Sequence, residues 1–409
     1  MVRVHPFPAI RPDNTLAETV ASVPYDVVNT EEARELAEGN PNSFLHVIRP
    51  EIDLPADTDP YDDSVYAKAR ENLDRLLDEG VLRQDDQPAM FLYRQVMGNI
   101  SQVGVVACCH IDDYNNDIIK KHEFTRKDKE DDRTRHVLSL NANTGPVFLT
   151  YRDDDKTRTL MERDMQSDPV YDFTSPDNVQ HTVWKVNDPQ AYSRAFEQIP
   201  VAYVADGHHR SASAARAGAE RRAANPSHSG NEEYNWFLSV LFPAGDLDIL
   251  PYNRVVADLN NLMPDQFLER LSEIGTVSPT DNPTPERSGV FCFYFDGQWH
   301  RLKLDPDSID RNDPVKSLDV SLLQDRVLGP VLGIGDPRTD KRIDFVGGIR
   351  GTKELERRVQ SGKAAVAVSM YPTTIEQLLA VADAGQVMPP KSTWFEPKLR
   401  SGLFVHRLD

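Results

Sequence analysis

The stretch Val201-Ala-Tyr-Val-Ala-Asp-Gly-His-His-Arg-Ser211 does most to decide the fold of this chain. Apolar residues run up to Asp206, which predicts a buried strand, and Gly207 permits an unusual backbone turn immediately after it. The pattern then becomes helical, with a long run rich in Ala and Arg that continues to about Ala224. We therefore predict a strand, a tight turn and the N-terminus of a long helix.

The side chains of this turn predict an anion site. Free N–H groups and a positive partial charge at a helix N-terminus favour an anion by about 0.3–2 kcal/mol. Arg210 would add a guanidinium suited to phosphate oxygens, and His208 and His209 would donate hydrogen bonds. Asp206 stands where it could hold Mg²⁺ beside the anion. An ordinary corner with exposed histidines is the alternative, but Asp, Gly and Arg together favour a functional interpretation.

Segments on both sides of the turn alternate between helix and strand signals. Gly98-Asn99 and Asp296-Gly297 separate apolar runs and indicate hairpins. The predicted helices cover 29–39, 61–79, 207–224 and 374–382, and the predicted strands cover 89–97, 100–111, 147–151, 182–186, 200–205, 290–295, 299–304 and 364–370. Because several strands look antiparallel, we expect an α+β fold rather than a doubly wound one. We expect three regions, at 1–85, 86–277 and 278–409.

Composition limits the partners of this protein. Its 409 residues include 46 Lys and Arg against 65 Asp and Glu, a net charge of −19. A field of that sign repels nucleic acid and anionic lipid, so we expect neither as a partner. No apolar run could span a membrane, the N-terminus has no secretion signal, and three cysteines are too few for a disulfide framework. We expect a cytoplasmic protein.

A polyphosphate would need a local basic island in such an acidic chain. Residues 120–135 carry seven basic and five acidic side chains. Lys121 and Arg133 are our candidates for contact with the donor, although the sequence does not select them among the seven. A solvated helix face laced with ion pairs is the favoured alternative on composition alone. Glu123, in the same segment, could accept the proton of an alcohol, although spacing alone does not select it.

A rigid loop near the C-terminus is the third candidate segment. Two prolines fix the backbone before Lys391, Ser392 and Thr393. These side chains could bind the carboxylate of an amino acid, or they could cap a helix. The residues themselves leave both possibilities open.

Together these motifs resemble a known family. Asp206-Gly-His-His-Arg210 resembles the signature of free-serine kinases in the ParB/sulfiredoxin-like superfamily. Lys121-His-Glu123 is similar to their Pro-His-Glu segment, Phe242-Pro-Ala244 to their aromatic-Pro-Ala strand, and residues 385–393 to their C-terminal loop. The whole chain also resembles a larger bacterial family long of unknown function, through Pro24-Tyr-Asp-Val27, Asn42-Ser-Phe-Leu-His46 and Pro389–Thr393. Members of that family are known as pyrophosphate-dependent L-serine kinases.

The resemblance implies a ParB/sulfiredoxin-like core, flanked by N- and C-terminal α/β regions, and an activity. It implies transfer of a phosphoryl group from pyrophosphate to L-serine, with Mg²⁺, Glu123 as base and Asp206 as metal ligand. The expected phosphate ligands are Gly207, His208, His209, Arg210, Ser211, Lys121 and Arg133, with His209 also catalytic. The expected serine site is Lys391, Ser392 and Thr393, with Ser43 and His46 in an N-terminal cover.

The chain departs from the compact nucleotide-using kinases in two respects. They have nothing like residues 1–85, and they have a tryptophan where this chain has Leu241. The absence of this tryptophan would fit a donor that has no nucleobase to stack on it, so pyrophosphate is preferred over ADP or ATP. Other possibilities are the reverse, phosphoserine-dephosphorylating reaction and a non-enzymatic ParB-like nucleotide switch. Sulfinic-acid repair is set aside, because His208 and His209 stand where sulfiredoxin has a cysteine.

Overall fold

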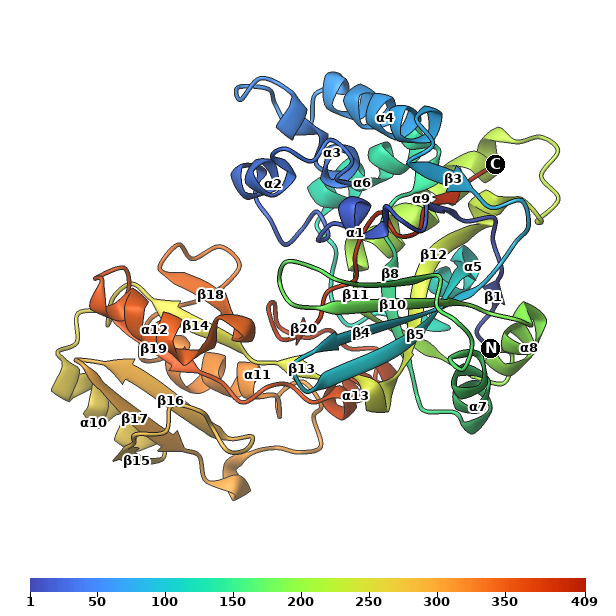
Figure 1. Cartoon of the computed structure of the whole chain (residues 1–409). Helices are drawn as coiled ribbons and strands as arrows, with labels where there is room; N and C mark the ends of the chain where they lie inside the picture. Colours follow the sequence, from blue (N-terminus) through green and yellow to red (C-terminus); the bar gives the residue numbers. More distant parts are fainter. The chain divides into compact units, whose positions relative to one another are not determined.

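The computed structural model describes residues 1–409, and they form two compact units (Figure 1). The first unit contains residues 1–247 and 397–409, and the second contains 248–396. The division differs from the three expected regions because strand pairing crosses their boundaries. The N-terminal strand β1 (Val4–His5) pairs with β5 (Ile100–His110), so residues 1–85 belong to the first unit. The strand β14 (Tyr252–Val256) pairs only within the second unit.

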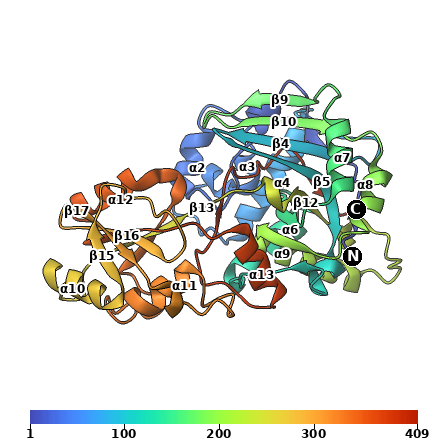
Figure 2. The same cartoon turned by 90° about the horizontal axis from the view of Figure 1, so that it is seen from below.

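The first unit is built on a mixed sheet of nine strands. Its order is β6-β11-β8-β12-β5-β4-β10-β9, and β1 pairs with β5 beside this path. Figure 2 shows β9, β10, β4 and β5 side by side in that order. The remaining strands are β4 (Phe91–Met97), β6 (Ile119–Lys120), β8 (Val147–Tyr151), β9 (Tyr171–Thr174), β10 (Gln180–Lys185), β11 (Ala202–Asp206) and β12 (Trp236–Pro243).

Turn chemistry and apolar runs explain the strands that the sequence predicts in this sheet, which are β4, β5, β8, β10 and β11. The hairpin of β4 and β5 turns at Gly98, whose φ is 57°. The strands β8, β11 and β12 bury nearly every side chain, which matches their continuous apolar runs. Smaller pairs join β2 (Ile10–Pro12) to β3 (Leu82–Gln84), and β7 (Ala142–Asn143) to β21 (His406–Arg407).

Helices of the first unit begin and end at recognisable caps. Asn29 and Glu32 form a capping box at the start of α2 (Thr30–Ala37), and Gly80 follows α4 (Asp63–Asp78) with a φ of 71°. The small side chains of α9 (His208–Ala224) let it pack on α6 (Lys127–Leu140). The other helices are α1 (Ala17–Val20), α3 (Leu45–Ile48), α5 (Ile111–Asn115), α7 (Asp155–Asp164) and α8 (Pro189–Phe196).

The second unit contains an antiparallel sheet of six strands, ordered β15-β17-β16-β19-β14-β18. Its hairpin turns at Asp296 and Gly297, which both have positive φ as the two-residue turn requires. The strands are β15 (Thr276–Pro279), β16 (Val290–Phe295), β17 (Gln298–Lys303), β18 (Ile343–Gly347) and β19 (Val366–Ser369), and β13 (Ile249–Leu250) pairs with β20 (Trp394–Phe395). The helices are α10 (Pro264–Ile274), α11 (Asp319–Leu323), α12 (Gly351–Gln360) and α13 (Ile375–Asp383).

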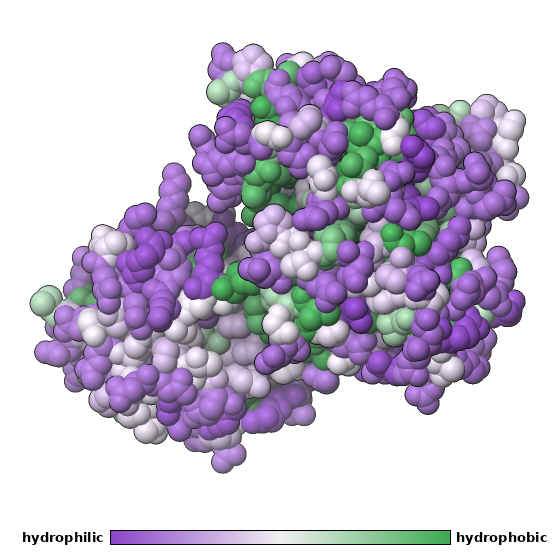
Figure 3. All heavy atoms as spheres, in the orientation of Figure 1, coloured by the Kyte–Doolittle hydropathy of each residue, from purple (hydrophilic) through white to green (hydrophobic).

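The α+β class is therefore confirmed. Hydrophilic residues dominate the face drawn in Figure 3, with only small hydrophobic patches between them. No helix is both long and apolar enough to cross a membrane.

Candidate active site

Parallel pairing of β6 with β11 brings the two main motifs together. Ile119 lies opposite Ala202 and Lys120 opposite Tyr203. Because parallel strands run in the same direction, the residues that follow β6 meet those that follow β11 at one edge of the sheet. Glu123 and the 206–210 turn are thereby brought together, although more than eighty residues of chain separate them.

The turn after β11 has a backbone that only glycine adopts easily. The register between β11 and β8 shifts between Val204 and Asp206, which is a bulge of the kind that re-aims side chains beside active sites. Gly207 has a φ of 93°, and α9 begins at the next residue. A Cβ at Gly207 would lie 3.0 Å from Nε of Arg210, so the guanidinium packs directly on the turn.

Cations surround the carboxylate of Asp206. Its Oδ2 accepts a hydrogen bond from Nη2 of Arg210 at 2.7 Å, and Nζ of Lys398 lies 3.6 Å from its Oδ1. Burial raises the pKa of Asp206, but Lys398 and Arg210 outweigh burial and lower the pKa to about 2. Asp206 is therefore ionised throughout the physiological range.

The buried side chain of Arg210 connects the turn to neighbouring segments. Its Nη1 donates to the carbonyl oxygen of Pro146 at 2.5 Å, and its side chain is 9% exposed. Its Nε is buried without a hydrogen-bond partner. Oδ2 of Asp26, from the N-terminal region, lies 3.8 Å from its Nη2. In this structure the guanidinium is therefore held between two carboxylates.

Two buried histidines lie beneath Glu123. Nδ1 of His208 lies 3.8 Å from Oε2 of Glu123, and the His208 ring meets the ring of His122 edge to face at 4.5 Å. Burial, followed by His122, lowers the pKa of His208 well below its usual value, and burial lowers the pKa of His122 to about 4. Both rings are neutral at pH 7. Glu123 itself is half-exposed, so a substrate can reach it.

His209 ties the Glu123 loop to the start of α9. Its Nε2 accepts a hydrogen bond from the backbone N–H of Arg126 at 3.0 Å. Burial lowers the pKa of His209, so the ring is neutral and carries its proton on Nδ1. That N–H is available to an anion at the helix N-terminus.

Arg133 and Arg210, both predicted at the phosphates, line one small cavity of about 30 Å³. Tyr25 also lines it, and the Arg133 guanidinium stacks 4.4 Å above the Tyr25 ring. A volume of this size holds one or two waters, so it is too small for pyrophosphate.

The basic segment is largely compensated by ion pairs. Lys121 binds Asp117 at 2.7 Å and lies over the ring of Tyr114. Arg133 binds Asp132 at 2.9 Å. Arg126 and Arg135 also have carboxylate partners, Asp128 and Asp63. The helix face laced with ion pairs, the alternative weighed on composition, is therefore what the structure contains at these positions.

Three other predicted residues use their polar atoms within the fold. The Ser211 hydroxyl donates to the carbonyls of Gly207 and His208 and is fully buried. The Ser43 hydroxyl accepts from the backbone N–H of Leu45. Both ring nitrogens of His46 are bonded, to Asp53 at 2.8 Å and to the carbonyl of Asn40 at 3.2 Å. The Ser211 hydroxyl is thus held by carbonyls of the turn itself, whereas the bonds of Ser43 and His46 lie within the N-terminal region.

The loop of Lys391, Ser392 and Thr393 belongs to the second unit. Lys391 has a φ of 60°, and the Ser392 hydroxyl donates to the carbonyl of Pro389 at 2.6 Å. Leu241, which suggested a donor without a base, is fully buried in the hydrophobic core of the first unit. Its side chain therefore does not bear on the choice of donor.

The sequence did not single out Asp26 or Lys398 as members of this site. Both approach the turn through long-range packing, which no local pattern announces. Asp26 does lie in the Pro24–Val27 motif, which gave it a weak signal, whereas Lys398 lies outside every motif described above.

The residues around the turn fit Mg²⁺ only when a phosphate shares it. No group of three or more His, Cys, Asp or Glu side chains gathers around a potential metal position. Asp206 is ionised, and Mg²⁺ commonly binds through one or two carboxylates together with substrate phosphates and water. A metal brought with its phosphate suits this donor set, whereas a resident metal does not.

Comparisons with known proteins identify a family but no activity. The family model described as "Protein of unknown function (DUF1015)" matches residues 4–321. A free serine kinase in complex with AMP is 13% identical, with a TM-score of 0.36 over 74% of this chain and 91% of that one. SbnI with a C-terminal truncation, from Staphylococcus aureus, is 12% identical, with a TM-score of 0.39 over 74% and 87%. A conserved hypothetical protein from Pyrococcus furiosus is 13% identical, with a TM-score of 0.35 over 74% and 95%. No curated protein matches the chain. At these scores the structural likenesses carry no argument about activity.

Proposed function

The chain belongs to the DUF1015 family, whose description names no activity, and we propose that it transfers a phosphoryl group from pyrophosphate to the hydroxyl of free L-serine. The observation that carries the proposal is the pairing of β6 with β11. It places a half-exposed carboxylate, Glu123, beside a helix N-terminus that offers free N–H groups to an anion. A base beside a phosphate site is what phosphoryl transfer to an alcohol requires.

The chemistry follows from these positions. The Glu123 carboxylate accepts the serine hydroxyl proton while the hydroxyl oxygen attacks the near phosphorus of pyrophosphate. The bond from that phosphorus to the bridging oxygen breaks, and inorganic phosphate leaves with the bridging oxygen. The N-terminal amides of α9 and the Nδ1–H of His209 offset the charge that develops on the leaving group. Mg²⁺, held by Asp206 and the donor, would neutralise part of the pyrophosphate charge.

Two exposed carboxylates near the turn support an acceptor with an ammonium group. Asp26 and Glu123 keep exposed carboxylates near Arg210 and His208, respectively. Such groups repel a bare polyphosphate and attract a cation. The ammonium group of a free amino acid and the Mg²⁺ bound to the donor would each place a positive charge near these carboxylates. The choice of pyrophosphate over a nucleotide rests on the family resemblance of the sequence.

The direct test is phosphorus NMR of the protein with L-serine, Mg²⁺ and, in separate samples, pyrophosphate, ADP or ATP. We expect O-phospho-L-serine and inorganic phosphate to appear with pyrophosphate alone. If product forms only with a nucleotide, the protein is a serine kinase but its donor is a nucleotide and not pyrophosphate. Tight binding without phosphoserine from any donor would overturn the proposal and favour a ligand-binding switch.

Glu123→Gln tests the proposed base. The amide preserves the shape of the side chain but accepts a proton very poorly, so turnover should fall about 10²–10⁴-fold. Pyrophosphate affinity, measured by calorimetry without serine, should not fall, because the substitution removes a negative charge. The matched control is Asp128→Asn, which removes an exposed carboxylate that forms an ion pair with Arg126 in the same segment. Near-normal turnover in Glu123→Gln would remove Glu123 from the mechanism.

A further inference from the structure

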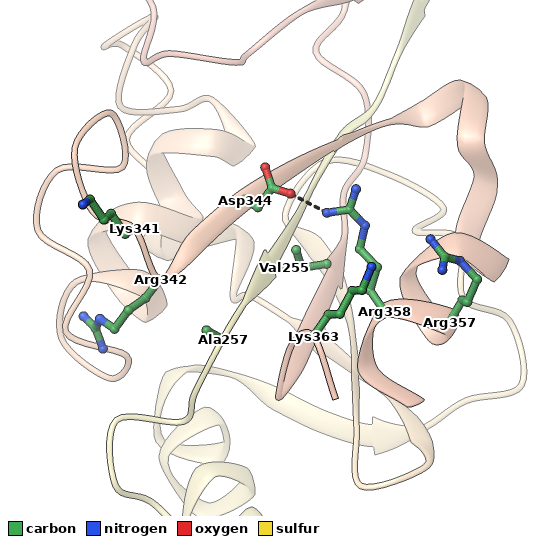
Figure 4. A pocket seen from close by; sticks show the side chains of 8 residues that line it. All are labelled: Val255, Ala257, Lys341, Arg342, Asp344, Arg357, Arg358 and Lys363. Atoms are coloured by element: carbon green, nitrogen blue, oxygen red, sulfur yellow. Dashed lines mark hydrogen bonds and ion pairs between the residues drawn. The ribbon is translucent and has the colours of Figure 1, made fainter. Parts of the chain in front are cut away.

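A basic pocket lies on one face of the antiparallel sheet of the second unit (Figure 4). Its cavity measures about 330 Å³. Val255 of β14 and Ala257 just beyond it form an apolar floor. Val255 lies opposite Asp344 of β18, and the backbone N–H of Ala257 donates to the carbonyl of Arg342. Because opposite residues of antiparallel strands share a face, Asp344 and Arg342 border the same floor.

Five cationic side chains and one carboxylate line this cavity. Figure 4 shows Lys341 and Arg342 on one side of the floor, and Arg358 and Lys363 on the other, with Arg357 beyond them. The chain as a whole carries a net charge of −19, so a cluster of five cationic side chains is unusual for this protein. The size also falls within the range of small-molecule sites in proteins.

The arginines of the pocket already have acidic partners. Arg342 binds Asp258 and Asp340, and Arg357 binds Glu354. Arg358 binds both Glu354 and Asp344. Arg357 and Arg358 also lie in the last turn of α12, where cations complement the helix dipole. These three side chains are therefore explained by the fold alone.

The two lysines are not explained in that way. Lys341 and Lys363 are exposed and have no carboxylate partner. Lys341 comes from the loop before β18, and Lys363 follows α12, so neither belongs to the helix end. Five cations against four carboxylates leave the pocket positive, and the repulsion among them would be relieved by an anion.

We propose that this pocket binds a small phosphate-bearing anion. The ammonium groups of Lys341 and Lys363 would interact with its oxygens as point charges. The planar guanidinium groups of the arginines at the rim could donate further hydrogen bonds. The proposal is independent of the serine kinase activity, since none of the lining residues belongs to the first unit.

Residue-resolved acetylation of the wild-type full chain tests the proposal. Lysines are acetylated with a water-soluble reagent, with and without pyrophosphate, inorganic phosphate or ATP, at constant ionic strength and without serine. We expect at least one of these anions to slow the acetylation of Lys341 and Lys363 about tenfold at saturation, as occupancy of a specific site would. Lys353 of α12 is exposed and lies outside the pocket, so its rate should stay constant. Equal rates with and without all three anions would overturn the proposal.

A second measurement separates this pocket from the site in the first unit. Calorimetry with the effective anion should show one binding site fewer in Lys341→Gln/Lys363→Gln than in the wild type. The control Lys353→Gln should keep the wild-type stoichiometry. An unchanged stoichiometry in the double variant would contradict the pocket and leave the kinase proposal untouched. Failure of the kinase would likewise leave this result in place.

Discussion

At Gly207 two independent constraints disfavour any side chain. Its φ of 93° lies in the region that L-residues adopt only at a cost, and a Cβ would stand 3.0–3.3 Å from three atoms of the Arg210 guanidinium. That guanidinium holds Asp206 and the Pro146 carbonyl. The glycine therefore fixes the position of Arg210, and through it the carboxylate proposed to share Mg²⁺ with the donor.

Gly207→Ala should therefore reduce both stability and turnover. The backbone alone costs roughly 1–2 kcal/mol for an L-residue in this region, and displacement of Arg210 adds to it. Gly39→Ala is the matched control, because Gly39 has a φ of 70° but a Cβ added there would meet nothing within 4 Å. Urea unfolding and serine phosphorylation of both variants are the measurements. Equal losses of stability, with full turnover in Gly207→Ala, would show that the Arg210 contact does not matter.

The sequence predicted the site residues that lie next to one another in the chain, but few of those that come from distant segments. The motif Asp206–Arg210 can be recognised from the sequence, because strand, turn and helix follow one another within a few residues. Glu123 could be chosen only through family resemblance, since many carboxylates satisfy the same composition. Asp26 and Lys398 reach the turn from far away in the chain. The inward orientation of Ser211 depends on the carbonyls around it.

At the scale of elements, capping and turn residues predicted four of the thirteen α-helices and eight of the twenty-one strands. The prediction of the Val147–Tyr151 and Val290–Phe295 strands coincides with β8 and β16, and the helix after Gly207 ends at Ala224 as expected. Sheet order was beyond reach, because it depends on pairing between distant segments. The pairing of β6 with β11, on which the active site depends, involves two residues of β6 and carries no local signal.

The N-terminus of α11 offers a prediction at this scale. Asp319 accepts hydrogen bonds from Ser288 and from the backbone of Gly289, but its Oδ2 is buried without a partner. Burial raises the pKa of Asp319 from 3.8 to about 6. The folded second unit therefore binds a proton more tightly than the unfolded chain, and it is destabilised as the pH rises through about 6.

Asp319→Asn keeps the acceptor oxygen and removes the buried charge. The variant should stabilise the second unit at pH 7, by up to about 3 kcal/mol from the size of the pKa shift. At pH 4, where the wild-type carboxyl is protonated, the two proteins should unfold at similar urea concentrations. The buried thiol of Cys292 in β16 reports unfolding of this unit when it becomes reactive. A variant less stable than the wild type at pH 7 would contradict this account.

Over the whole molecule, the ionisable groups give the two units different responses to acid. In the first unit, burial lowers the pKa of His122 and of His136 to about 4, and that of His181 to about 3. Each folded histidine binds protons less readily than its unfolded counterpart, so stability is lost as the pH falls below 6.5. At pH 5 the loss is about 2 kcal/mol for each histidine. Three such losses approach the stability of an ordinary domain.

The second unit has opposing contributions over the same range. Protonation of Asp319 stabilises it as the pH falls through about 6, whereas burial lowers the pKa of His300, which acts in the other direction. Ion pairs lower the pKa of other carboxylates, such as Glu354 with a pKa of about 2. Their contribution to folding stability is lost only below about pH 4.5. Between pH 7 and pH 5 the second unit should therefore change much less than the first.

Buried cysteines make this difference measurable in the intact chain. Cys108 and Cys109 lie in β5 of the first unit, and Cys292 lies in β16 of the second. Pulses of a pyridyl disulfide, which reacts at acidic pH, would be applied along a urea series and read for each cysteine by mass spectrometry. The urea midpoint for Cys108 and Cys109 should fall from pH 7 to pH 5, with a smaller shift for Cys292. Equal shifts for all three would mean that the units unfold as one, or that the buried histidines do not control the acid response.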